Sequence, residues 1–399
     1  MYDNDSRHTA AAPTLLPVTP GERIDAIDVL RGIAILGVLI AYTLWNLGSP
    51  PASTFSTPDK VIEFALTVFL DSKAYTLLAF LFGVGFSIQM RRAEEAGKSI
   101  VPVYVRRLLA MIMIGGVHAL LLRNGDILVP YATMGFVLLL FRNASDKTLI
   151  VAALVGSVVQ YAAYWLWQLS GIPFPVRPET GGMSHISANF LWVKYSYATA
   201  ITNWPGSLPM LFFGLYIGRQ RVLENIWAYK KMLRRVMFVG LAVGVVFFAG
   251  PLVVLPMLPR NELTRALFPY TGNVHAWGFA AFYASAVLLL LQRRFWQKAL
   301  SPFAPVGRMA LTNYLLQATI IVPVCVSFDL YDKVTPSLGL LLAVLVFLVQ
   351  LPLSVVWLRH FRFGPAEWLW RSITYWKPQP LRLTVSAPQT VQAVLSTVE

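Results

Sequence analysis

Apolar stretches long enough to cross a hydrocarbon core recur along the chain, with short polar connections between them. A membrane-spanning helix needs about 20 apolar residues, whereas a strand of a membrane barrel needs only about 10 of alternating polarity. The stretches here are too long and too continuous for strands, so the pattern predicts helices. We expect about ten spans, of which the fourth and sixth are short, at residues 30–48, 65–90, 104–122, 127–141, 148–169, 204–218, 234–258, 274–292, 309–328 and 336–358.

The composition agrees with this pattern. Of the 399 residues, 56% are hydrophobic and 13% are charged, whereas an average soluble domain has about 25% charged residues. These values disfavour a cytosolic enzyme, a disordered chain and a soluble nucleic-acid binder. Cys325 is the single cysteine, which excludes an internal disulfide framework. The predicted fold class is therefore an all-α, polytopic helical bundle in the lipid bilayer.

The net charge of +14 is explained by topology. When Lys and Arg are assigned to alternate sides of the predicted spans, 25 of the 33 lie on one side. Cytoplasmic loops collect positive residues, so we expect both termini in the cytoplasm. The basic residues are scattered over several loops and tails, so we expect no nucleic-acid partner. The first twenty residues show no cleavable signal peptide.

The spans and connections suggest five parts of the chain. We expect a flexible tail at residues 1–20, an N-terminal transmembrane bundle at 21–169, an outer loop at 170–204, a C-terminal transmembrane domain at 205–378 and a second flexible tail at 379–399. The outer loop is the longest connection, and two interpretations of it stay open. It is either a lid or binding loop on the acceptor side or a passive linker.

A histidine and an aspartate flank the turn between the third and fourth spans. His118 lies in the last turn of one helix and Asp126 in the first turn of the next, so the short turn brings them close together. A carboxylate partner orients an imidazole and makes it a better general base near neutral pH. The alternative roles are an interhelical hydrogen bond for His118 and a helix N-cap for Asp126.

An aspartate and an arginine mark the start of the first span. Asp28 and Arg31 are three residues apart, which places them on one face of a helix. The structural interpretation is a capped and anchored helix start. The functional interpretation is that Arg31 binds a phosphate of a nucleotide-containing donor, because its planar guanidinium matches that group.

Two further polar clusters lie near the predicted cytoplasmic side. In the ninth span, Asn313 and Gln317 are four residues apart and share a helix face, so they line a polar cavity or join neighbouring helices. Near the C-terminus, the segment FGPAEWLWRSITY reads as a helix on the membrane surface or as a site lining. The two clusters contribute the candidate residues Arg308, Asn313, Tyr314, Gln317, Glu367 and Arg371.

Motifs for several other chemistries are absent from the sequence. There is no HExxH, GxSxG, Walker loop or Cys and His ligand set, so we expect no metal site, serine hydrolysis or ATP-driven pumping. We also expect no permanently bound cofactor.

Five segments give the chain a resemblance to the YeiB-like family of bacterial inner-membrane proteins, which carry a C-terminal domain of unknown function. These segments are RIDAIDVLRGIAILGVLI, LFGVGFSIQMRRAEEAG, YVRRLLAMIMIGGVHALLLRNGDILVPYATMG, GRMALTNYLLQ and FGPAEWLWRSITY. The resemblance covers nearly the whole chain outside the two tails and implies a multi-pass protein of the bacterial inner membrane.

The opening segment also looks like the start of larger transmembrane acyltransferases, including heparan-alpha-glucosaminide N-acetyltransferase. That similarity implies a cytoplasmic acyl-CoA cosubstrate, a sugar acceptor on the far side of the membrane and a catalytic histidine. Arg31 matches the arginine of the family pattern. The histidine that closes the first span in O-acyltransferases is replaced by Tyr42, and residues 43–117 contain no histidine.

The leading hypothesis is acyl transfer from an acyl-CoA-type donor to an envelope glycan or a similar hydroxyl or amine. Arg31 and Arg308 would bind the donor phosphates, and His118 with Asp126 would deprotonate the acceptor. The polar passage would be lined by Asp28, Tyr42, Asn313, Tyr314 and Gln317. The alternatives are a small-molecule transporter that uses the same residues without an acyl donor, and a non-catalytic scaffold. The sequence does not predict the oligomeric state.

Overall fold

The computed structural model describes residues 25–45, 47–122, 125–176, 178, 183–254, 257 and 262–383. Within these ranges the regular structure is helical, and one isolated antiparallel bridge joins Phe361 to Arg382. The predicted all-α fold class is confirmed. The predicted tail at 1–20 lies outside the described residues, as do residues 384–399 of the second tail.

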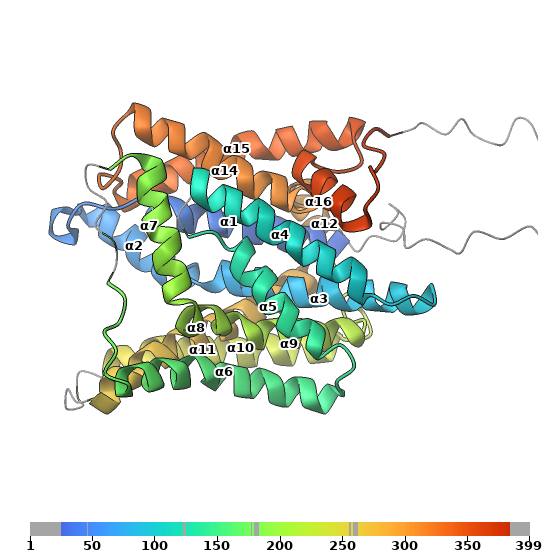
Figure 1. The fold of residues 1–399 in the computed structure, drawn as a ribbon, viewed down its shortest axis with the longest axis horizontal. Coiled ribbons are helices and arrows are strands. Elements are labelled where there is room, and N and C mark those ends of the chain that lie inside the picture. Colours follow the sequence, from blue (N-terminus) through green and yellow to red (C-terminus); the bar gives the residue numbers. More distant parts are fainter. Residues whose placement is uncertain are drawn as a thin grey trace, which may run out of the picture.

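Eight helical stretches of this part of the chain are long and apolar enough to cross a membrane, so the protein is a multi-pass membrane protein. They run side by side along the long axis of the molecule (Figure 1). They are formed by α1 (Asp25–Trp45), α2 (Thr57–Phe69) continued by α3 (Lys73–Glu95), α4 (Val101–Leu121), α6 (Asp146–Leu169), α10 (Lys230–Val254), the Asn273–Leu290 part of α11 (Glu262–Leu290), α14 (Ala310–Ser327) and α15 (Pro336–His360).

The two short predicted spans also form helices. They are α5 (Leu128–Leu140), with 13 residues, and α9 (Leu208–Arg219), with 12 residues. At 1.5 Å per residue each is only about 20 Å long, which is less than the thickness of a hydrocarbon core. The prediction of about ten spans therefore resolves into eight long candidates and two shorter helices.

Two expected elements differ in detail. The predicted span at 65–90 is broken between α2 and α3, where Ser72 adopts a left-handed backbone with φ of 63°. The connection at 170–204 is not irregular, because it contains α7 (His185–Ala198) and α8 (Ala200–Asn203). Ser184 caps α7 by accepting a hydrogen bond from the Ser187 amide. In Figure 1, α7 lies across the bundle, nearly perpendicular to the long helices.

The remaining helices are short. They lie in the connections or near the ends of the long helices, and comprise η2 (Ala52–Thr54), η3 (Trp204–Ser207), α12 (Arg294–Leu300), α13 (Phe303–Arg308) and α16 (Pro365–Tyr375).

Helix α1 lies in the core of the bundle, whereas α10 lies at its surface. Leu30, Val38 and Leu39 of α1 are completely buried. In α10, by contrast, Phe238 and Val239 are more than half exposed. Apolar side chains on the outside of a bundle are typical of helices that face lipid tails, because lipid is as apolar as the protein core.

A very close helix contact positions the beginning of α1. Gly307 of α13 lies against the backbone of α1, and a Cβ atom at Gly307 would overlap the carbonyl oxygen of Asp28. Gly32 of α1 lies equally close to the carbonyl oxygen of Phe303. Small residues permit such approaches between helices in a membrane. The contact brings together the chain segments that carry Arg31 and Arg308.

Candidate functional site

His118 and Asp126 form a buried pair at the turn between α4 and α5. The Nδ1 atom of His118 lies 2.9 Å from Oδ1 of Asp126, and the two side chains are 2% and 3% exposed. Gly115, one turn before His118, makes room for this contact, because a Cβ there would lie 2.7 Å from Oδ2 of Asp126. The contact predicted from the sequence is therefore present in the fold.

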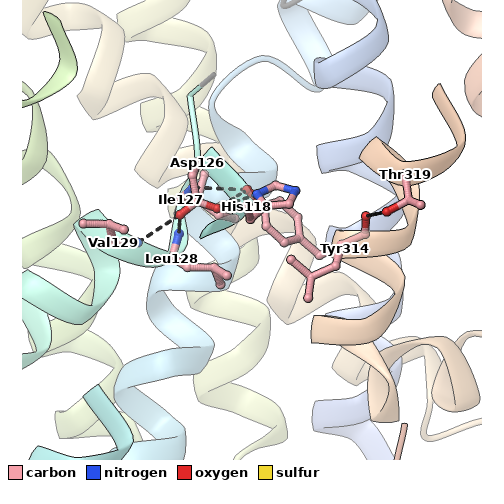
Figure 2. Close-up of polar contacts among 8 residues, drawn as sticks. His118, Asp126, Ile127, Leu128, Val129, Tyr314 and Thr319 are labelled. Carbon is pink, nitrogen blue, oxygen red and sulfur yellow. Dashed lines mark hydrogen bonds and ion pairs between the residues drawn. The ribbon is translucent and has the colours of Figure 1, made fainter. Parts of the chain in front are cut away.

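Tyr314 joins this pair from a distant part of the chain. Its hydroxyl donates to Oδ1 of Asp126 at 2.9 Å and accepts from the Ile127 amide at 3.2 Å. Figure 2 shows Tyr314 and His118 pointing toward Asp126 from α14 and α4. The sequence pattern predicts Tyr314 in a separate cluster near the cytoplasmic side, because nothing in the local sequence indicates a contact across 188 residues.

The second oxygen of Asp126 caps α5. Oδ2 accepts hydrogen bonds from the amides of Leu128 at 2.7 Å and Val129 at 3.1 Å. These amides belong to the first turn of the helix, where a negative charge is also favoured by the helix dipole. The carboxylate therefore accepts four hydrogen bonds. Asp126 both caps the first turn of α5 with its side chain and partners the histidine, two roles that the sequence left as alternatives.

This arrangement determines which nitrogen of His118 is available for chemistry. A carboxylate only accepts hydrogen bonds, so Nδ1 carries the proton and Nε2 has the lone pair. The Nε2 atom is buried and has no hydrogen-bond partner among the described residues. A buried polar atom without a partner is uncommon and costs free energy. Such an atom is suited to accept a proton from a bound substrate.

Helix α7 lies beside this pair. The side-chain amide of Asn189 donates to the carbonyl oxygen of Leu120 at 3.3 Å, two residues after His118. Tyr197, near the other end of α7, is close enough to Asp126 that burial and the carboxylate charge both raise the pKa of its phenol. The connection that the sequence suggested as a lid or binding loop thus packs next to His118 and Asp126.

A group of arginines lies near the start of α1 and α4. Arg31 is 3.4 Å from Asp28, in agreement with the shared helix face that their spacing predicted. The Arg31 side chain remains one third exposed. Arg107 of α4 and Arg371 of α16 are close to it, since the positive charges of the three side chains interact. Burial lowers the pKa of the Arg371 guanidinium, the neighbouring Tyr375 and Glu367 side chains oppose this shift, and the charge of Arg31 adds to it. Several guanidinium groups held together in this way favour an anion.

Aromatic rings orient two of these arginines. The guanidinium of Arg107 lies 3.8 Å from the centre of the Trp370 ring, and that of Arg371 lies 4.6 Å from the centre of the Phe363 ring. Trp370 also donates a hydrogen bond to the Arg107 carbonyl oxygen at 2.9 Å. The Nε atom of Arg107 is buried without a partner in the described part of the chain. Nothing in the local sequence distinguishes Arg107 from the other basic residues, so this site is not among the predictions.

Arg308 follows Gly307 and therefore lies at the contact between α13 and α1. Its Nε atom is buried and has no partner among the residues that the structure describes. Arg308 thus belongs to the same end of α1 as Arg31, as the sequence suggested. Its predicted role in binding a donor stays a prediction.

Asn313 and Gln317 form hydrogen bonds between helices. Asn313 donates to Ser354 of α15 at 2.9 Å, and Gln317 donates to the Ile35 carbonyl oxygen of α1 at 3.2 Å. Gln350 of α15 returns a hydrogen bond of 2.8 Å to the Asn313 carbonyl oxygen. These contacts match the interhelical alternative for both residues, and the predicted passage that they would line stays a prediction.

The other two predicted lining residues, Tyr42 and Asp28, both belong to α1, and their role in lining a passage stays a prediction. Tyr42 is 2% exposed and close to Tyr331. It lies 11 residues beyond Arg31 on α1, which is about 16 Å along the helix axis. The Asp28 carboxylate forms an ion pair with Arg31.

Glu367 caps α14. Its Oε1 accepts hydrogen bonds from the amides of Leu311 at 2.6 Å and Thr312 at 3.1 Å, and its Oε2 accepts one from the Thr312 hydroxyl. Burial raises the pKa of the Glu367 carboxyl, and these hydrogen bonds oppose the rise. A structural role for Glu367 therefore accompanies the interfacial position that the sequence suggested. It ties α16 to the beginning of the helix that carries Tyr314.

A buried lysine and histidine form a second polar contact that sequence analysis missed. The ammonium group of Lys73 is 2.8 Å from the carbonyl oxygen of Thr67 and 2.9 Å from Nε2 of His275. Lys73 is 1% exposed. The sequence feature that could have indicated this contact is a lysine inside a long apolar stretch. The partner lies 202 residues away and has no sequence signature.

No group of three or more His, Cys, Asp or Glu side chains within the described ranges is arranged to hold a metal ion.

Comparison with known families divides the chain into two matching regions. Residues 23–175 match the family described as heparan-alpha-glucosaminide N-acetyltransferase, catalytic. Residues 217–377 match the family described as a protein of unknown function, DUF418. The first region contains Arg31, Arg107, His118 and Asp126, and the second contains Tyr314 and Arg371. The N-terminal region therefore resembles a transmembrane acyltransferase.

Relatives match over nearly the whole length. The uncharacterized protein YxaH of Bacillus subtilis (strain 168) is 32% identical over 425 residues, which cover 92% of this chain and 98% of that protein. The uncharacterized protein YeiB of Escherichia coli (strain K12) is 29% identical over 392 residues, which cover 88% and 96%. The resemblance stated from the sequence segments is confirmed: the chain belongs to the family of multi-pass membrane proteins that includes YxaH and YeiB.

Proposed function

We propose that the protein transfers an acyl group from an acyl-CoA-type donor to a hydroxyl or amine of an envelope glycan or a similar acceptor, in the bacterial inner membrane. The observation that carries the proposal is the unpartnered, buried Nε2 of His118, whose ring is oriented by Asp126. The match of the N-terminal region to an acetyltransferase catalytic family supports the same reaction class.

In this reaction Nε2 of His118 takes the proton from the acceptor hydroxyl or amine as that group attacks the carbonyl carbon of the thioester. The new C–O or C–N bond forms while the C–S bond breaks, and the departing thiolate receives the proton from the imidazolium. Asp126 keeps Nδ1 protonated and stabilises the positive charge on the ring during the step. A positioned general base of this kind contributes about 10²–10⁴-fold in rate.

The proposed donor-phosphate site and the proposed catalytic histidine lie at different depths along helix α4. It carries Arg107 near one end and His118 near the other, 11 residues apart, which is about 16 Å along the axis. A donor with its phosphates at Arg31, Arg107 and Arg371 would have to extend its acyl end along α4. The pantetheine arm of coenzyme A is a long, flexible chain suited to such a separation. Arg308, at the neighbouring α13 contact, is the fourth candidate for the phosphates.

The position of α7 supports an acceptor site near His118. The contacts of Asn189 and Tyr197 are with the segment that carries the catalytic pair, and α7 runs across the long helices rather than parallel to them (Figure 1). A cover of this type lets a large, polar acceptor approach from one side while the donor approaches from the other. We therefore assign α7 to the acceptor side.

The test is acyl transfer by the purified, full-length protein in proteoliposomes. Radiolabelled acetyl-CoA is supplied on one side and a panel of sugars and glycolipids on the other. We expect His118→Ala to lower transfer at least 100-fold. The matched control is His360→Ala, because His360 is an exposed histidine at the end of α15. Undiminished transfer by His118→Ala would contradict the proposal. Donor-independent movement of a solute across the membrane would support the transporter alternative instead.

A further inference from the structure

A second group of arginines surrounds a pocket on the opposite face of α3 from Arg31. The pocket has a volume of about 550 Å³ and is formed by the end of α3, the turn between α5 and α6 and the end of α9. We call it the arginine pocket. Its charged lining consists of Arg91, Glu94, Arg142, Arg219 and Arg221.

The wall of the pocket is fixed by Arg219. Its guanidinium donates hydrogen bonds to the carbonyl oxygens of Ala144 at 2.6 Å and Arg142 at 2.5 Å. The neighbouring Gln220 donates to the Asp146 carboxylate at 2.7 Å. The turn between α5 and α6 is thereby held against α9 through its backbone. Arg219 is consequently a structural residue of the pocket, since both of its Nη atoms bind backbone carbonyl oxygens and its guanidinium also lies 3.6 Å from the Asp146 carboxylate.

Two of the remaining arginines retain unused donors. Arg91 is paired with Glu224 and lies 3.8 Å from Glu95. Arg142, by contrast, donates one long hydrogen bond of 3.4 Å to the Leu139 carbonyl oxygen. Arg221 has no side-chain hydrogen bond or ion pair to the described residues, and its backbone is in the left-handed region with φ of 54°. Each guanidinium offers five donors in a planar fork that matches phosphate oxygens.

The arginine pocket is separate from the arginines at Arg31. Gly85 of α3 faces Arg31, whose Nη2 lies 3.5 Å from the position of a Cβ at that glycine. The pocket residues Ser87, Arg91 and Glu94 are rotated by about 180–240° around the same helix, since successive residues are 100° apart. The body of α3 therefore lies between the two groups of positive charge.

From this geometry we propose that the arginine pocket binds a phosphate or diphosphate group, through Arg142 and Arg221, on the membrane face predicted to be cytoplasmic. The shared chemistry is a negatively charged phosphate group. It is carried either by a soluble molecule or by the headgroup of an anionic phospholipid. The volume is in the range of pockets that bury small ligands, about 300–1,000 Å³. This site is independent of the proposed acyl transfer.

The test measures thermal unfolding of the full-length protein in nanodiscs. The background carries Arg31→Gln, which removes one of the proposed phosphate-binding arginines and so weakens binding at the proposed donor site. Inorganic pyrophosphate in phosphatidylcholine nanodiscs is the soluble probe, and increasing phosphatidylglycerol content is the lipid probe. We expect a saturable rise in Tm, because a ligand that binds only the folded state stabilises it. Adding Arg142→Gln and Arg221→Gln should raise the half-saturating concentration at least tenfold.

The control pair is Arg293→Gln and Arg359→Gln, which removes the same charge from exposed positions outside the pocket. It should leave the half-saturating concentration unchanged. Both pocket substitutions keep the backbone carbonyl groups that bind Arg219, so folding is expected to survive. If Arg31→Gln does not give a monodisperse protein, the same comparison is made with native Arg31.

A response to pyrophosphate identifies a soluble phosphate ester, and a response to phosphatidylglycerol alone identifies a lipid headgroup. Either result, when lost in the pocket variant and kept in the control, supports the site. Equal responses in pocket variant and control, or no response to either probe, would overturn it.

Discussion

Asp126→Asn separates the two roles of the carboxylate at the α4–α5 turn. The carboxamide oxygen is expected to keep capping α5, because the Leu128 and Val129 amides are donors and need an acceptor. Its NH₂ group would then face Nδ1 of His118. That nitrogen must accept instead of donate, so the ring proton moves to Nε2 and the general base is lost.

The size of both effects follows from the hydrogen bonds. Asp126 accepts four of them as a charged group. A charged hydrogen bond contributes about 1.5–3 kcal/mol and a neutral one about 0.5–1.5 kcal/mol, so we expect a loss of about 2–4 kcal/mol in stability. Loss of the general base should lower acyl transfer about 10²–10⁴-fold. Transfer in proteoliposomes, thermal unfolding, and ¹⁵N NMR of histidine-labelled protein measure the three quantities.

Tyr314→Phe is the matched control for this experiment. It removes one hydrogen bond to Asp126 and leaves the Ile127 amide without its partner, which costs about 1–3 kcal/mol. The tautomer of His118 should persist, so activity should fall far less than in Asp126→Asn. The reasoning would be refuted if Asp126→Asn stayed within tenfold of the wild-type rate, or if the NMR spectrum showed Nδ1 still protonated.

Three further changes test other parts of the structure. Gly307→Ala forces a methyl group onto the Asp28 carbonyl oxygen. We expect the free energy of unfolding to fall by about 1–3 kcal/mol, and an unchanged Tm would contradict the close contact. Arg107→Gln should raise the donor KM at least tenfold with little change in kcat, as expected for lost binding; equal kinetics would remove Arg107 from the donor site. Because burial raises the pKa of Glu367, its protonated form stabilises the fold at low pH. This contribution is lost as pH rises through the folded-state pKa. Wild type should therefore lose Tm relative to Glu367→Gln as pH rises above the ordinary range of a carboxyl group, and parallel curves would refute it.

The long helices and the His118–Asp126 pair were predictable from local sequence. Apolar stretches of about 20 residues determine membrane helices, and a short turn necessarily brings its two flanking residues together. The break at Ser72 was not predictable, because the apolar pattern continues through it. A left-handed serine carries no hydropathy signal.

Contacts between residues far apart in the chain could not be predicted from the sequence. Tyr314 reaches Asp126 over 188 residues, and Lys73 reaches His275 over 202 residues. Each depends on how helices are packed, and side-chain spacing reports only the faces of a single helix. The position of Arg107 was likewise not predictable. Its charge was visible in the sequence, but its position over Trp370 depends on how α16 docks on α4.

The docking of α16 on α4 has a consequence for how the chain is assembled. Arg106 donates to the Thr374 carbonyl oxygen at 2.9 Å, and Trp370 donates to that of Arg107. These contacts, like the one between Tyr314 and Asp126, join the two regions that match separate families. Each region taken alone would lose these hydrogen bonds to the other. A gene split in the connection at 170–204 should therefore yield two fragments that are unstable alone and recover together, and the two regions are expected to be inherited as one unit.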